Sequence, residues 1–135
     1  MKSVRIYLFM IIIVFLFGSC SLDRKNPLDP HGNDNIEVPL MVVGLELSST
    51  GGVVNIRWQR SEKVNKYRLY RSQSYDGAYE LIQTIAMTGL ETENTVTAVD
   101  DNVALQQYYY YKVSAVNVQG LEGPISSYKY VLVRM

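Results

Sequence analysis

The chain has 135 residues, and 13 Lys and Arg side chains balance 13 Asp and Glu side chains. This balance excludes a strong electrostatic attraction to nucleic acid or to anionic lipid, and the length suits one domain. A single cysteine excludes an internal disulfide, and a single histidine leaves few groups for acid–base catalysis.

The beginning of the chain has the pattern of a secretory signal peptide. Lys2 and Arg5 make the start basic, Ile6–Phe17 is an uninterrupted apolar run, and the small residues Gly18 and Ser19 follow. A basic region, an apolar region and small residues in this order are typical of a cleaved signal. The apolar run is shorter than the about 20 residues that a helix needs to cross a bilayer.

Cys20, the only cysteine, comes directly after this segment. The sequence Phe17-Gly18-Ser19-Cys20 resembles the lipobox of bacterial lipoproteins, with Phe17 where that motif usually has Leu. The resemblance implies that residues 1–19 are removed and that Cys20 becomes the acylated first residue, carrying palmitate or similar chains. It also implies a lipid membrane as partner and a place in the bacterial cell envelope, at the outer membrane on its periplasmic or surface-exposed side. Two alternatives are an ordinary cleaved signal with an incidental cysteine and an uncleaved membrane anchor.

Residues 20–38 are predicted to be the lipidated cysteine followed by a flexible linker. This stretch is rich in Pro, Asn and Asp and has too few apolar residues to bury a core. Asp29, His31 and Asp34 could in principle hold a cation, but a flexible segment with one histidine is a poor ligand set. We therefore expect no metal site.

From Pro39 to Met135, hydrophobic residues recur every second position, as in β-strands. In Val54–Gln59 the alternation is strict and places Trp58 on a buried face. Clusters of Gly, Asp, Asn and Pro mark the turns between strands. The predicted strands, in chain order, are Leu40–Leu47, Val54–Gln59, Lys66–Leu69, Tyr79–Ile85, Thr92–Val99, Tyr108–Val118 and Ser126–Val133. Seven short strands with regular turns predict an all-β sandwich.

Three stretches of this region resemble a fibronectin type III domain: Trp58, Tyr67–Arg71 and Tyr109–Asn117, the last preceded by Asp100 and Val103. The resemblance covers residues 39–135 and implies an immunoglobulin-like, seven-stranded β-sandwich. It assigns the tyrosine corner of this family to Tyr109, whose ring packs inward while its hydroxyl bonds to the backbone upstream. The predicted structural core comprises Trp58, Tyr67, Leu69, Tyr109, Tyr111 and Val113.

Tyrosine is unusually frequent, and all of the 11 tyrosines except Tyr7 follow residue 66. The outward face of the third and sixth strands is a candidate binding face. Such a face can take a protein partner or stack on sugar rings, since aromatic residues are enriched at interfaces. The alternative is that its residues form cross-strand pairs that only stabilise an exposed sheet. The candidate face comprises Arg68, Tyr70, Tyr108, Tyr110 and Lys112.

The sequence contains no motif for catalysis or for a cofactor, and Asp100-Asp101 is interpreted as a pair of turn caps. We therefore expect neither enzymatic activity nor a cofactor, and no nucleic acid partner. The leading hypothesis is a membrane-anchored adhesion, scaffold or protein-interaction module of the cell envelope. The alternative is a carbohydrate-binding accessory module of a system that uses or degrades polysaccharides.

Overall fold

The computed structural model describes residues 37–89 and 93–135, and these residues form β-strands and no helix. The predicted signal peptide, Cys20 and the linker up to residue 36 lie outside the described residues. None of the described segments is a helix long and apolar enough to cross a membrane. The strands are β1 (Glu46–Thr50), β2 (Val53–Gln59), β3 (Val64–Ser72), β4 (Glu80–Ala86), β5 (Thr95–Asp100), β6 (Tyr108–Asn117) and β7 (Lys129–Leu132).

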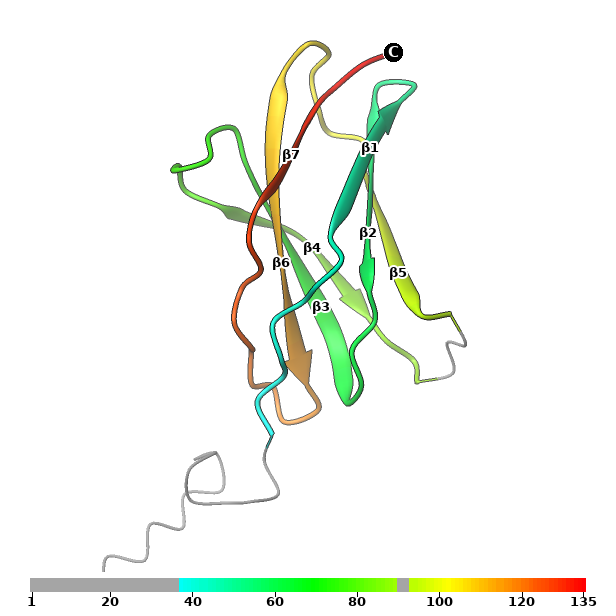
Figure 1. The fold of residues 1–135 in the computed structure, drawn as a ribbon, viewed down its shortest axis with the longest axis vertical. Coiled ribbons are helices and arrows are strands. Elements are labelled where there is room, and N and C mark those ends of the chain that lie inside the picture. The colour runs from blue at the N-terminus through cyan, green and yellow to red at the C-terminus, as the bar shows by residue number, and fades with distance from the viewer. Residues whose placement is uncertain (1–36, 90–92) are drawn as a thin grey trace, which may run out of the picture.

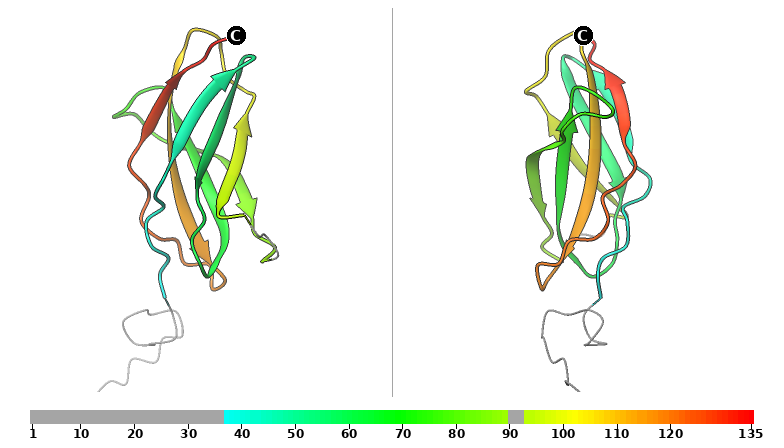
Figure 2. Two further views of the ribbon diagram at one scale, coloured as in Figure 1. Left: turned by 45° about the vertical axis from the view of Figure 1, so that its right-hand side comes forward. Right: turned by 90° about the vertical axis from the view of Figure 1, so that its left-hand side faces the viewer.

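These strands form two antiparallel sheets that pack face to face (Figure 1 and Figure 2). One sheet has the order β1-β2-β5, and the other has the order β4-β3-β6-β7. The predicted all-β, seven-stranded sandwich is therefore confirmed for the described part of the chain.

The core lies between the sheets, because each long strand turns every second residue inward. In β2 the buried residues are Val54, Ile56 and Trp58, and the residues between them are exposed. The Trp58 and Tyr67 rings meet edge to face, with centroids 5.4 Å apart and planes at 66°. The residues predicted as structural core each expose 4 % of their surface or less: Trp58, Tyr67, Leu69, Tyr109, Tyr111 and Val113.

The first strand begins later than predicted, at Glu46 instead of Leu40. Val42 and Leu45 are buried, but they are three residues apart and the segment is not part of a ladder. Gly44 interrupts it with a φ of +69°, and a Cβ there would lie 2.8 Å from the side chain of Gln59. The prediction of this strand's start was wrong because burial alone does not require strand pairing.

The last strand is shorter than the predicted Ser126–Val133, since β7 covers only Lys129–Leu132. The hydroxyl of the buried Ser126 accepts a hydrogen bond from the backbone N–H of Val113 at 3.0 Å. The backbone N–H of Ser126 donates to the Val113 carbonyl at 2.9 Å. The Ser126 hydroxyl thus takes the place of a backbone carbonyl as the acceptor beside β6, and the regular ladder between β6 and β7 begins only after Ser126.

The chain enters the sandwich at Glu37, beside the β2–β3 and β6–β7 loops (Figure 1). The Glu37 carboxylate pairs with Lys63 at 2.7 Å, and its carbonyl accepts the Asn117 side-chain N–H at 2.8 Å. A Cβ on Gly123 would lie 2.3 Å from the Pro39 carbonyl oxygen, so this glycine permits close packing of the entering segment. Met135 lies at the opposite end of the sandwich, together with the β1–β2 and β5–β6 loops.

Candidate functional site

The candidate binding face lies on the outer surface of the four-stranded sheet. In the ladder between β3 and β6, Tyr70 stands opposite Lys112 and Arg68 stands opposite Ser114. Tyr110 and Tyr108 continue this face along β6, because alternate residues of a strand share one side. The structure thus places all the predicted residues on one sheet, but it divides them into a polar part and an aromatic part.

The polar part is centred on Glu122, which the sequence analysis did not single out. Its carboxylate accepts hydrogen bonds from the Tyr70 hydroxyl at 2.6 Å, from the Ser114 hydroxyl and from the Arg68 guanidinium. Partial burial alone would raise the pKa of the Glu122 carboxyl, but the bonds from Ser114 and Tyr70 and the Arg68 charge outweigh burial and lower this pKa. Arg68 and Tyr70 are therefore engaged inside the protein.

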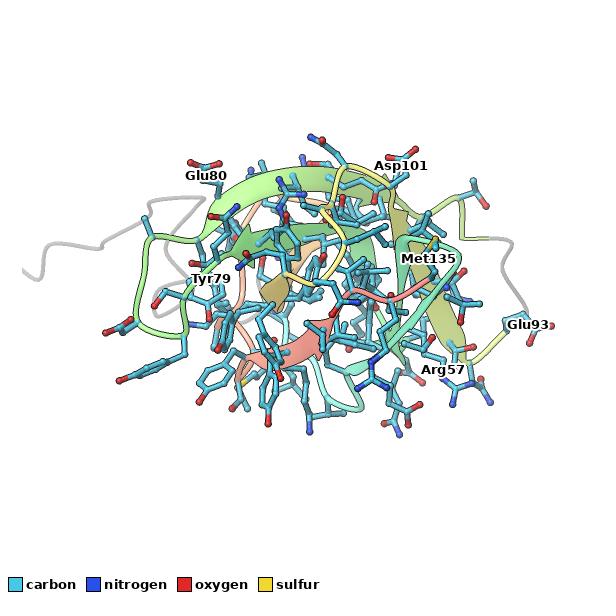
Figure 3. The ribbon with its side chains drawn as sticks, turned by 90° about the horizontal axis from the view of Figure 1, so that it is seen from above. Arg57, Tyr79, Glu80, Glu93, Asp101 and Met135 are labelled. Atoms are coloured by element: carbon cyan, nitrogen blue, oxygen red, sulfur yellow. The ribbon has the colours of Figure 1, made fainter. Side chains whose placement is uncertain are left out.

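The aromatic part comprises Tyr108, Tyr110 and Lys112 together with further tyrosines. The Tyr110 ring lies 5.7 Å from the rings of both Tyr128 and Tyr130, and the Lys112 ammonium lies 4.0 Å from the centroid of the Tyr79 ring. Viewed from above, Tyr79 projects from the side of the β3–β4 loop, and Arg57 lies on the other side of the sandwich (Figure 3).

Tyr79, Tyr128 and Tyr130 were not predicted as part of this face. The signal that identifies two of them is the alternation in the last strand, where Tyr128 and Tyr130 are separated by one residue. Since β7 pairs with β6 and Tyr130 stands opposite Tyr110, the same alternation places both rings on the outer surface. Tyr79 has no such signal, because it precedes β4 in a loop.

A second polar cluster, also missed, lies at the edge of the core. Arg71 pairs with the buried Asp100 at 2.9 Å, and the Tyr111 hydroxyl donates to the same carboxylate at 2.9 Å. Burial, followed by the negative charge of Asp100, raises the pKa of the Tyr111 phenol far above its usual range. Asp100 also accepts the N–H of Asn102 at 3.1 Å, which is the turn-capping role expected from the sequence. The alternation of residues in β3 could have indicated this cluster. It turns Arg71 toward the core side, which it shares with the buried Leu69, and a cation on that side needs an acidic partner.

Two buried tyrosines fix loops through their hydroxyls. The Tyr109 hydroxyl accepts the N–H of Ala104 at 3.1 Å, five residues upstream, which is the geometry of a tyrosine corner. The Tyr67 hydroxyl accepts the N–H of Ser61 at 2.7 Å and so holds the β2–β3 loop. In residues 37–89 and 93–135, no three His, Cys, Asp or Glu side chains are grouped so that they can hold a metal ion.

Comparisons with known proteins identify the fold. No protein-family model matches the sequence, and no curated protein is similar to it. Among solved structures, a Fn3-like protein from Clostridium thermocellum is 28% identical, with a TM-score of 0.56 over 73% of this chain and 94% of that chain.

Two human domains are more distant in sequence but similar in structure. The sixth fibronectin type III domain of human fibronectin type III domain containing protein 3 is 16% identical, with a TM-score of 0.56 over 73% of this chain and 88% of that chain. The third fibronectin III domain of the human KIAA0343 protein is 16% identical, with a TM-score of 0.57 over 76% and 88%. Together with the seven-stranded sandwich and the Tyr109 corner, these similarities show that the described domain has a fibronectin type III-like fold.

Proposed function

We propose that this protein is a lipid-anchored component of the bacterial cell envelope and that its fibronectin type III-like domain is a non-catalytic interaction module. The observation that carries the proposal is the position of Cys20, the only cysteine, directly after an apolar run and two small residues. A fibronectin type III-like domain is a common protein-interaction module, and this fold is the part of the proposal that rests on the structure.

The way the chain enters the domain supports this arrangement. Glu37 is held by Lys63 and Asn117 at one end of the sandwich, so an anchor upstream of it would hold the domain by that end. The outer surface of the four-stranded sheet runs along the side of the molecule, from this attachment toward the opposite end. A tether at one end therefore leaves the side of the domain open to a partner.

The hydrogen bonds of two acidic side chains, the buried Asp100 and the half-buried Glu122, support a non-catalytic role. Asp100 is held by Arg71 and Tyr111, and Glu122 accepts hydrogen bonds from side chains of β3 and β6. A general acid or base needs a free position beside a substrate, within hydrogen-bond reach of the proton that it moves. Both carboxylates instead serve to hold strands and loops together.

Fractionation of cells that express the full chain tests the anchor. We expect the protein in the membrane fraction with incorporated label when the cells are fed an alkyne fatty acid. Cys20→Ala removes the only thiol, so it should abolish labelling and release the protein or leave it unprocessed. Ser21→Ala, the adjacent change, should alter neither result. A Cys20→Ala protein that is still labelled and membrane-bound would refute the proposal.

A further inference from the structure

The tyrosines of the described domain fall into two groups according to their hydroxyls. In one group each hydroxyl has a partner inside the domain: Tyr67, Tyr70, Tyr109 and Tyr111, and Tyr79, which donates to the Tyr75 carbonyl at 3.2 Å. The remaining five tyrosines have no hydroxyl hydrogen bond to any part of the chain that the structure describes. They are Tyr75, Tyr108, Tyr110, Tyr128 and Tyr130, which we call the tyrosine row.

The tyrosine row is a continuous chain of ring contacts. Tyr108 contacts Tyr130 at 6.1 Å between centroids, and Tyr130 contacts Tyr110 at 5.7 Å. Tyr110 in turn contacts Tyr128 at 5.7 Å, and Tyr128 contacts Tyr75 at 6.3 Å. The row therefore extends from the beginning of β6 across β7 to the β3–β4 loop, and each ring restrains its neighbour.

Four residues of the tyrosine row are exposed although their rings touch one another, and Tyr110 between them is half-buried. Tyr130 exposes 60% of its surface and Tyr75 exposes 59%. Large exposed aromatic residues are unusual when they are contiguous, because contiguous apolar surface generally marks a binding site. Mutual contacts reduce the entropy that each ring would lose on binding, so the row is ordered before a ligand arrives.

The charges around the row favour a neutral ligand. Burial, followed by the neighbouring phenols Tyr128 and Tyr110, raises the pKa of the Tyr79 phenol. The Lys112 ammonium rests on the Tyr79 ring, and the Asp76 carboxylate accepts the Ser74 hydroxyl. The row itself thus offers apolar ring faces and free hydroxyls, and the charged side chains next to it are of both signs: Lys112, Lys129 and Asp76.

We propose that the tyrosine row binds a neutral polysaccharide chain. Sugar rings offer C–H faces that pack on aromatic rings and hydroxyls that bond to the free tyrosine hydroxyls, so both chemical features of the row are used. Tyrosine is also enriched at protein interfaces, so the test below includes a protein partner as the competing outcome. The inference names the partner of the interaction module proposed above, but it does not depend on the lipid anchor.

Retention of the full chain, kept in detergent, on native gels that contain polysaccharide tests this inference. The neutral probes are hydroxyethyl cellulose, xylan and galactomannan, and polygalacturonate is the charged probe. We expect retention by at least one neutral probe and weaker retention by polygalacturonate. Tyr110→Ala and Tyr130→Ala should each weaken retention about tenfold, because each removes a ring from the middle of the row.

The matched control is Val99→Ala, since Val99 is exposed by 53% on β5 of the other sheet. This variant should bind like the original chain, and thermal unfolding should show all three variants folded. Tyr130→Phe keeps the ring and removes only the hydroxyl, so the retention of this variant should lie between that of the original chain and that of Tyr130→Ala.

Several results would overturn the inference. Retention by none of the neutral probes would do so, as would retention that is unchanged in both alanine variants. Stronger retention by polygalacturonate would contradict a neutral ligand. If the alanine variants lose a protein partner while no polysaccharide is retained, the row is a protein interface and the inference is wrong. None of these results depends on Cys20, so they are separate from the test of the anchor.

Discussion

Replacing Asp100 with alanine should be one of the most damaging substitutions on the edge of the core. Asp100 is 6% exposed, and the change leaves the Arg71 guanidinium and the Tyr111 hydroxyl without their acceptor. Breaking a buried ion pair from one side costs about 3–5 kcal/mol. Arg71 keeps its bond to the Asn102 carbonyl at 2.6 Å and its position over the Tyr109 ring, so we expect about 3 kcal/mol, at the lower end of that range.

The assay is urea-induced unfolding followed by the fluorescence of Trp58, the only tryptophan, which is fully buried. A loss of about 3 kcal/mol should also lower Tm by roughly 12 °C or more in a domain of this size. The neighbouring Asp101 is exposed, and Asp101→Ala should change the free energy of unfolding by about 0.5 kcal/mol or less. Tyr111→Phe removes one hydrogen bond to the Asp100 carboxylate and should cost about 1.5–3 kcal/mol, the range for a bond to a charged group. An Asp100→Ala variant as stable as Asp101→Ala would refute the reasoning.

Three further substitutions test other parts of the structure. Trp58→Ala should lower the free energy of unfolding by roughly 3–5 kcal/mol, because it empties the centre of the core; a loss under about 1 kcal/mol in urea unfolding would contradict this burial. Gly123→Ala places a Cβ against the Pro39 carbonyl, so it should speed amide hydrogen exchange in residues 37–43, and unchanged exchange would show that the contact is not required. Because the pKa of Glu122 is lower in the folded protein, its ionised form stabilises the fold above the unfolded value, near 4.5, and this stabilisation is lost as pH falls through the folded value. Glu122→Gln should therefore weaken the loss of stability below pH 4.5, and the same acid sensitivity in both proteins would argue against this role.

The core could be predicted from the sequence because it depends on local alternation. Trp58 is identified by its own strand, since a period of two residues assigns each side chain to a face before any partner is known. The same reasoning places Tyr70 and Tyr110 on the outer surface. The start of β1 could not be predicted in this way, because Val42 and Leu45 are buried without being paired in a ladder.

The polar clusters depend on contacts between distant parts of the chain. Glu122 comes from the β6–β7 loop, and its bond to Arg68 joins residues 54 positions apart. Arg71 and Asp100 belong to different sheets and are 29 positions apart. Alternation shows which way Arg71 points, but it does not say which acid meets it. For the same reason the sequence could not show that the candidate binding face has two parts. Arg68 and Tyr70 bond to Glu122, and no local pattern connects Glu122 to them.

We propose that Cys20 anchors an interaction domain to a membrane. The intact mass of the protein extracted from the membranes of cells that make it tests this claim most directly. If Cys20 is the anchor, the mass will be that of a chain that begins at Cys20 plus the added mass of acyl groups. A chain that begins at Cys20 or elsewhere with an unmodified thiol, or one that keeps residues 1–19, would contradict it.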